Sequence, residues 1–293
     1  MDSTSTFGID QATGVTHALS AHGSDWLWAV TAVYLVVFLV LLGLCFATPE
    51  ADRVFHYLFT CMLLAGSTIY FAQAADLGWT AVDDRQLFWA KYANWAVSFP
   101  AAAIALGLLA DVSWTTIFTN VFSCLLWVVS YLCGSFVVSS SYRWGLFAFG
   151  TLAYTILAMS TLNESREAAQ RQGQGMARDY MVLASVANAA WLLYPVAWGL
   201  GDGSGTIGVT AAWVFVGVLD VVQTPVLAVA FVVLSRRWDY ARLNLNLSES
   251  RSGWHAGEAS GIHGSSHDDI NGNGDNGKDF ARPDALPLQE TAA

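Results

Sequence analysis

The stretch WLWAVTAVYLVVFLVLLGLCFA, residues 26–47, decides the class of fold. It contains no charged side chain, and it is long enough to cross the hydrocarbon core of a bilayer, which takes about 20 apolar residues in a helix. A surface helix of a water-soluble domain would instead alternate an apolar stripe with a polar face. We therefore predict that this stretch is a membrane-spanning helix.

Six further apolar stretches follow it, in a chain of 293 residues that is 55% hydrophobic and 12% charged. Ordinary soluble domains are about a quarter charged. The predicted crossings are approximately 26–47, 54–77, 88–110, 114–138, 142–162, 180–200 and 206–234. Several connections are short, which favours a single compact all-α bundle of seven transmembrane helices. We assign residues 1–25 to a polar N-terminus, 26–243 to the seven-helix domain and 244–293 to a tail.

The distribution of arginines predicts the orientation of the bundle, since cytoplasmic loops are enriched in Lys and Arg. Seven arginines fall on the side of the tail and two on the side of the N-terminus: Arg53, Arg166, Arg171, Arg178, Arg236, Arg237 and Arg242 against Arg85 and Arg143. The N-terminus is therefore expected outside and the tail in the cytoplasm. The acidic tail is rich in Gly, Ser, Asn and Asp, and such a composition predicts disorder.

Composition and motifs also argue against several functions. A net charge of −10 is unsuited to nucleic acid, which attracts basic surfaces. The sequence has no Gly-rich phosphate loop, Gly-x-Ser-x-Gly elbow or His-Glu-x-x-His pair, so we predict that the protein is not an enzyme. No metal site is expected either, because the tail histidines are loosely spaced: His255, His263 and His267.

The four cysteines all fall in apolar stretches, and none forms a Cys-x-x-Cys pair. They are Cys45, Cys61, Cys124 and Cys133. This pattern is typical neither of a disulfide framework nor of a zinc site. We predict four buried free thiols.

Two ionisable residues within the predicted crossings need an explanation, because a charge at the centre of a bilayer is costly. Lys91 shares one helical face with Asn94, Trp95 and Ser98, and Asp220 lies in the seventh crossing. We expect this face to point into the bundle and Lys91 to pair with Asp220, which would keep both charges ionised. The alternative is that Lys91 extends to the membrane surface while Asp220 is protonated or bound to water.

The sixth crossing contains the aromatic run WLLYPVAW, residues 191–198. Trp191, Tyr194 and Trp198 share one face, and Pro195 interrupts the backbone hydrogen bonds so that the helix can bend. Inward-facing aromatic rings are able to wall a pocket for a flat apolar ligand. Ordinary packing is the alternative interpretation. Pro225 is expected to distort the seventh crossing in the same way.

Three runs resemble the signatures of the third, sixth and seventh helices of microbial rhodopsins. They are KYANWAVSFP (residues 91–100), WLLYPVAW (191–198) and LDVVQTP (219–225). They occur in the family's order and at family-like separations, and the similarity covers about residues 26–243. The resemblance implies the seven-helix fold of that family, with a retinal pocket lined by Trp95, Trp191, Tyr194, Pro195 and Trp198.

Several positions depart from the pigmented members of that family. The position of the lysine that forms the retinal Schiff base is Thr224, and the only lysines in the chain are Lys91 and Lys278. The position of the carboxylate counterion is Asn94, and that of the cytoplasmic proton donor is Ala105. The resemblance with these departures implies no covalent retinal, no other cofactor and no light-driven pumping.

The same combination is similar to the non-pigmented branch of fungal opsins, which includes the 30 kDa heat-shock-type proteins. The opening SDWLWAV, residues 24–30, also resembles the first helix of fungal members. This similarity implies a stress-related or chaperone-like, multi-pass plasma-membrane protein. Its partners would be the lipid bilayer and other membrane proteins, including a proton ATPase, and homo-oligomers are common among similar proteins.

Two alternatives remain open at this point. Instead of a stress-related or chaperone-like protein, the chain would be a receptor that binds retinal or another apolar ligand without a covalent bond, or a passive ion or proton channel. In the first case Trp95, Tyr194 and Trp198 would flank the ligand, and Lys91 and Asp220 would meet its polar end. In the second, Lys91 and Asp220 would form a polar pathway.

Overall fold

The computed structural model describes residues 15–49 and 52–238. In chain order the elements are α1 Ala21–Ala47, α2 Val54–Ala74, β1 Thr80–Val82, β2 Arg85–Leu87, α3 Ala90–Ala110, α4 Trp114–Phe136, α5 Ser140–Met159, the π-helical turn η2 Ser160–Glu164, α6 Ser165–Arg171, α7 Gln174–Trp198, the π-helical turn η3 Gly199–Gly203, α8 Val209–Val221, the π-helical turn η4 Val222–Val226 and α9 Leu227–Ser235. The predicted tail, residues 244–293, lies outside the described residues, so its disorder stays a prediction.

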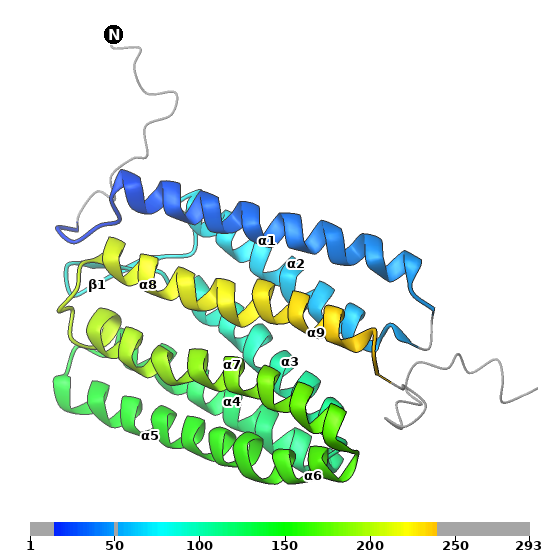
Figure 1. Ribbon diagram of the computed structural model, residues 1–293. Coiled ribbons are helices and arrows are strands. Elements are labelled where there is room, and N and C mark those ends of the chain that lie inside the picture. Colours follow the sequence, from blue (N-terminus) through cyan, green and yellow to red (C-terminus); the bar gives the residue numbers. More distant parts are fainter. Residues whose placement is uncertain (1–14, 50–51, 239–293) are drawn as a thin grey trace, which may run out of the picture. The chain divides into compact units, whose positions relative to one another are not determined.

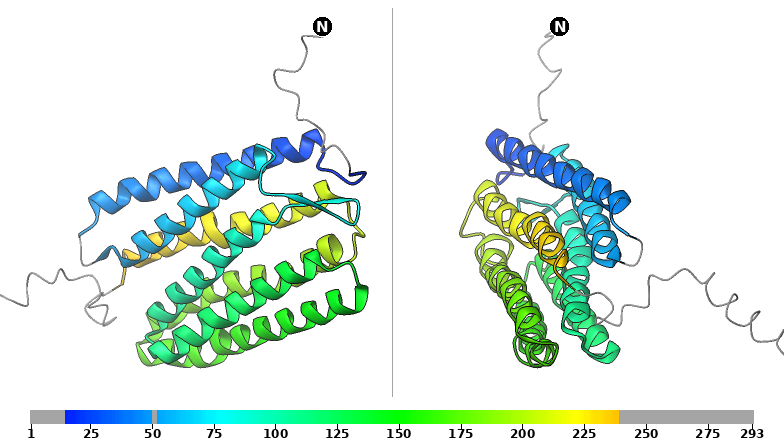
Figure 2. Two further views of the ribbon diagram at one scale, coloured as in Figure 1. Left: turned by 180° about the vertical axis from the view of Figure 1, so that it is seen from behind. Right: turned by 45° about the vertical axis from the view of Figure 1, so that its right-hand side comes forward.

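The all-α seven-helix architecture is confirmed. Among the described residues, seven helices are long and apolar enough to cross a membrane: Ala21–Ala47, Val54–Ala74, Ala90–Ala110, Trp114–Phe136, Ser140–Arg171, Gln174–Gly203 and Val209–Ser235. They lie side by side in one bundle, as Figures 1 and 2 show. Short connections make sequential neighbours antiparallel, and α1 packs on α2 and α4 on α5.

The ends of the fifth and sixth spans differ from the prediction. The fifth continues through η2 and the polar helix α6 to Arg171, and the sixth begins at Gln174. Hydropathy locates the apolar part of a span, whereas a helix continues for as long as its backbone bonds are made. The turn between the two spans passes through Gly173, whose φ of 120° is a conformation that favours glycine.

A β-hairpin that the sequence analysis did not predict joins α2 to α3. Strands β1 and β2 pair antiparallel, and the two turn residues Asp83 and Asp84 both have positive φ, 51° and 59°, as a type I′ turn requires. The backbone of His17 joins the hairpin by accepting from the amide of Gln86 at 3.0 Å. We refer to this end of the bundle, defined by residues 80–87, as the hairpin end.

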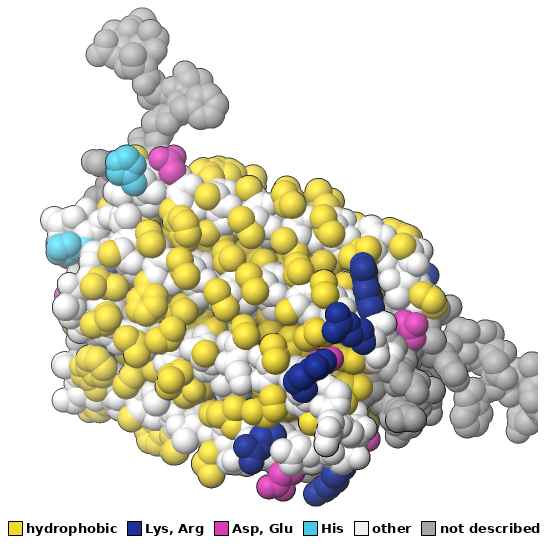
Figure 3. All heavy atoms as spheres, in the orientation of Figure 1, with side chains coloured by type: hydrophobic (Ala, Val, Ile, Leu, Met, Phe, Trp, Pro, Cys, Tyr) yellow, Lys and Arg dark blue, Asp and Glu magenta, His cyan; other side chains and the backbone are white. Residues whose placement is uncertain are grey.

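The outer surface of the bundle is apolar along its length and charged towards its ends. Figure 3 shows hydrophobic side chains over the flank and basic side chains along the end of the bundle where α9 and α6 lie. Large side chains such as Phe118, Phe122 and Phe149 are about two-thirds exposed. An apolar surface of this extent is unfavourable in water and suited to lipid. The chain is therefore a multi-pass membrane protein.

All four cysteines are free, as predicted. Cys45 and Cys124 are buried, but Cys61 and Cys133 are exposed, so the prediction of burial is wrong for these two. The reason is that an apolar stretch in a membrane bundle has a lipid-facing side as well as a core-facing side.

Candidate functional site

The carboxylate of Asp220, on α8, lies at the centre of the bundle and is 2% exposed. Four side chains donate hydrogen bonds to it: the Tyr70 hydroxyl, the Tyr194 hydroxyl at 2.5 Å, Trp95 Nε1 at 3.0 Å and Asn94 Nδ2 at 3.4 Å. These donors come from α2, α7 and α3. A buried carboxylate held by several donors is satisfied without a cationic partner.

The positions of these donors follow from the local sequence. The face formed by Lys91, Asn94, Trp95 and Ser98 is buried throughout, which confirms that it points into the bundle. Asn94 and Trp95 are adjacent on α3 and reach Asp220 together. The inward polar stripe predicted from the sequence is therefore the part of α3 that contacts Asp220 on α8.

The backbone beyond Asp220 is distorted, as expected for a helix that contains proline. Pro225 lies in the π-helical turn η4, where its missing N–H leaves no α-helical bond to break. Thr224 precedes it and is 1% exposed. The sixth span behaves differently, because α7 continues as an α-helix through Pro195 as far as Trp198.

Aromatic rings fill the interior on the side of Asp220 that faces α4 and α7. The ring centroids of Phe99 and Tyr194 are 4.8 Å apart, those of Phe99 and Trp127 are 4.9 Å apart and those of Trp95 and Tyr194 are 5.1 Å apart. Trp191 is fully buried and lies 6.3 Å from Phe99. At these distances the rings are in direct contact with one another.

The predicted pair between Lys91 and Asp220 is wrong. Lys91 Nζ forms an ion pair with Asp202, and both side chains are less than 10% exposed. Lys91 lies in the first turn of α3 and Asp202 in η3, so both are near the hairpin end, whereas Asp220 is one helical turn deeper, level with Asn94. The alternative in which Lys91 extends to the membrane surface is also wrong, because this side chain is buried.

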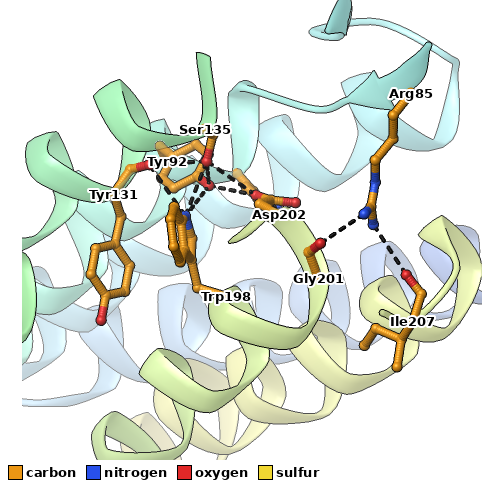
Figure 4. Close-up of polar contacts among 9 residues, drawn as sticks. Arg85, Tyr92, Tyr131, Ser135, Trp198, Gly201, Asp202 and Ile207 are labelled. Carbon is orange, nitrogen blue, oxygen red and sulfur yellow. Dashed lines mark hydrogen bonds and ion pairs between the residues drawn. The ribbon is translucent and has the colours of Figure 1, made fainter. Parts of the chain in front are cut away.

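A second polar cluster surrounds Asp202 (Figure 4). The Tyr92 hydroxyl donates to its carboxylate at 2.5 Å and the Ser135 hydroxyl at 3.4 Å. Trp198 Nε1 donates to the Tyr92 hydroxyl at 2.8 Å and to Ser135 Oγ at 3.0 Å. The aromatic residues predicted to flank one ligand are thus divided, because Trp198 belongs to the Asp202 cluster and Trp95 and Tyr194 to the Asp220 cluster.

Asp202 was missed because the predicted sixth crossing ended at Leu200. A signal was present, since Tyr194, Trp198 and Asp202 follow one another at intervals of four residues and therefore share a helical face. The π-helical turn η3 extends the helix far enough to bring Asp202 inward.

Outside the spanning segments, two carboxyl groups near the hairpin have pKa values shifted in opposite directions. Asp84 accepts from the backbone amide of Thr16 at 3.1 Å and also from its hydroxyl. These bonds lower the pKa of the exposed Asp84 carboxyl below its ordinary value. Burial instead raises the pKa of Asp76, which accepts from Gln86 at 2.8 Å.

Comparison with known proteins identifies the family. The model of the family described as bacteriorhodopsin-like proteins matches residues 22–235. The chain belongs to this family. The opsin-like protein carO of Fusarium fujikuroi is 33% identical to it, over 79% of each chain. The 30 kDa heat shock protein of Saccharomyces cerevisiae is 29% identical, over 73% of this chain and 72% of that protein.

Solved structures agree with this assignment. A light-driven proton pump from Leptosphaeria maculans has a TM-score of 0.72 and 25% identity, covering 76% of this chain and 99% of the pump. A light-driven proton pump from Coccomyxa subellipsoidea has the same TM-score at 22% identity. The bundle is therefore of the microbial rhodopsin type, in a membrane protein whose relatives include one named for heat shock.

Proposed function

We propose that this protein is an opsin-fold membrane protein that works without covalently bound retinal. In this proposal it acts in the plasma membrane, in stress or growth regulation, through contacts with lipids and other membrane proteins such as a proton ATPase. It is neither an enzyme nor a light-driven pump.

A retinal Schiff base needs an amine beside Asp220, and the observation that carries the proposal is that none is present there. Residues 209–235, which form the last span, contain no lysine, and the buried residue one turn after Asp220 is Thr224. In the part of the chain that the structure describes, Lys91 is the one lysine, and it is paired with Asp202. The residues present therefore do not fit a covalent retinal.

The surroundings of Asp220 support the same conclusion. Both of its carboxylate oxygens accept hydrogen bonds from protein side chains. These bonds stabilise the negative charge without a neighbouring cation. Asn94 donates to this carboxylate through its amide, and an amide does not take up a proton near neutral pH. A photocycle would lack both its cation and its proton acceptor.

The same geometry weakens the two alternatives. The rings of Trp95, Phe99 and Tyr194 contact one another, which leaves no gap between them for a flat ligand. The channel interpretation depended on a Lys91–Asp220 pathway, and Lys91 pairs with Asp202 instead.

The proposed orientation, with the N-terminus outside, has support from the ends of the helices. Arginines lie at the end opposite the hairpin, namely Arg53, Arg166, Arg171, Arg178, Arg236 and Arg237. Arg85 and Arg143 lie at the hairpin end. This asymmetry is typical of a bundle whose hairpin end faces outwards.

Proton transport by the plasma-membrane ATPase tests the proposed role. ATP-driven proton uptake would be measured in plasma-membrane vesicles from heat-stressed yeast cells with and without this protein, in the dark and under illumination. We expect a difference between the two vesicle types that is equal in the dark and in the light. Identical uptake in both types would contradict the regulatory role, and a difference seen only under illumination would contradict the proposed independence from light.

A further inference from the structure

A cavity of about 250 Å³ opens at the hairpin end, apart from the Asp220 cluster. The hairpin, the start of α5 and the connection between α7 and α8 contribute its walls. Its charged lining includes Arg85, Arg143 and Asp202, and its apolar lining includes Val82, Ile207 and Val209.

The two guanidinium groups of this cavity are fixed by backbone carbonyls. Arg85 donates to the carbonyls of Gly201, at 2.7 Å, and Ile207, at 3.3 Å, as Figure 4 shows. Arg143 donates to the carbonyls of Gly203, at 2.9 Å, Val137, at 2.8 Å, and Val138, at 3.3 Å. Neither guanidinium forms an ion pair within residues 15–49 and 52–238. The connection between α7 and α8 therefore orients two cations at the cavity, although the charge of Arg85 also acts on Asp202.

The two carboxylates that line the cavity are either paired with a cation or exposed to solvent. Asp202 is paired with Lys91 and accepts from Tyr92, so this pair contributes no net charge. Asp83 is exposed at the hairpin turn, where the high dielectric of water weakens its field. The balance of charge in the cavity is positive.

Each guanidinium also keeps free donors. Arginine has five N–H groups in a planar fork that matches a carboxylate. Arg85 uses two nitrogens for carbonyl bonds, which leaves N–H groups for a ligand. We propose that this cavity binds a small organic carboxylate. The carboxylate would lie against Arg85 and Arg143, and a short carbon chain against Val82, Ile207 and Val209.

Titration of succinate into the full-length protein, in nanodiscs of uncharged lipid at low ionic strength, tests this proposal by calorimetry. We expect saturable binding. Arg143→Gln should weaken it by roughly tenfold or more, as expected for the loss of a charge-assisted pair. Gly208→Leu should weaken it similarly, because a Cβ at Gly208 meets no atom within 4 Å and this residue lines the cavity.

Gly208→Leu also distinguishes a blocked cavity from a misfolded protein. It leaves both arginines in place, and the φ of Gly208 is −63°, which other residues adopt readily. Two variants outside the cavity are matched controls. Gly175→Leu is the same substitution at a position that is equally open, and Arg178→Gln removes an arginine whose side chain is 70% exposed.

Binding that is weakened in both test variants and unchanged in both controls would support the proposal. Three results would overturn it: no saturable binding of succinate, equal affinity in folded Gly208→Leu, or inorganic phosphate that binds as tightly as succinate. The last result would assign the cavity to inorganic oxyanions in general, because the apolar lining would then contribute nothing.

Discussion

The carboxylate of Asp220 joins its own span to three others, and its removal should be costly. In Asp220→Ala, the hydroxyls of Tyr70 and Tyr194 and the indole N–H of Trp95 lose their acceptor. A buried donor left unsatisfied costs about 1 to 3 kcal/mol, so we expect the free energy of unfolding to fall by roughly 3 kcal/mol or more.

Unfolding by sodium dodecyl sulfate in mixed micelles measures this change. Asp25→Ala serves as the control, because Asp25 is an exposed aspartate on α1. If the two variants were equally stable, the hydrogen-bond cluster at Asp220 would have no structural importance.

A double-mutant cycle distinguishes the two possible partners of Lys91. Removing one member of a buried ion pair leaves an uncompensated charge, whereas removing both does not. Lys91→Met and Asp202→Asn should therefore be coupled by about 1 kcal/mol or more. Lys91→Met and Asp220→Asn should be nearly additive. Strong coupling only in the second cycle would contradict the arrangement of both clusters.

The sequence was a sufficient guide to which residues face inwards but not to which of them meet. The period of the helix predicts the buried stripe of Lys91, Asn94 and Trp95, and all three are buried. The partner of Lys91 depends on how far α7 continues beyond its apolar part. Asp202 becomes available because η3 adds a further turn to that helix, which hydropathy does not register.

At the scale of the elements, Gly66 sets the distance between α1 and α2. A Cβ at Gly66 would lie 2.2 Å from Cε1 of the buried Tyr34 ring, so Gly66→Ala forces these helices apart. We expect a loss of roughly 1 to 3 kcal/mol in the free energy of unfolding, as for other overpacked cores. Gly43→Ala is the matched control on α1, because a Cβ there meets nothing within 4 Å. Equal stability of the two variants would contradict this close packing.

The link between the N-terminal segment and the hairpin should depend on pH. Hydrogen bonds from Thr16 lower the pKa of Asp84 below the ordinary 3.8. The link is therefore fully stabilising above pH 3.8 and is lost as the pH falls through the lower pKa of the folded protein. Carboxyl ¹³C shifts from NMR should give a midpoint below 3.8 for Asp84, and a higher midpoint in Thr16→Ala. Identical midpoints would show that Thr16 does not hold this carboxylate.

The elements themselves were largely predictable, for physical reasons that also explain the exceptions. Long apolar runs without charges are required by the bilayer, so all seven spans are visible in the sequence. The hairpin is not, because its strands have three residues each and produce little periodicity. Its signal was the Asp83–Asp84 turn, which takes the left-handed conformation at both positions.

For the whole molecule, the shared fold and the proposed lack of a pigment rest on different parts of the sequence. The chain shares its fold with light-driven proton pumps, but Thr224 stands beside an Asp220 that is satisfied by protein donors. The fold and the family therefore follow from the long apolar segments and the three motifs, while our proposal that the protein works without covalent retinal rests on single positions within them.

The visible absorption spectrum of the purified protein with all-trans-retinal, followed by acid denaturation to detect an adduct, tests this account most directly. Thr224→Lys, which returns an amine to the last span, provides the comparison. We predict that the wild-type protein gives neither a red-shifted band nor a covalent adduct. A red-shifted band with an adduct that survives denaturation would mean that Lys91 leaves Asp202 to bind retinal, and would contradict the account.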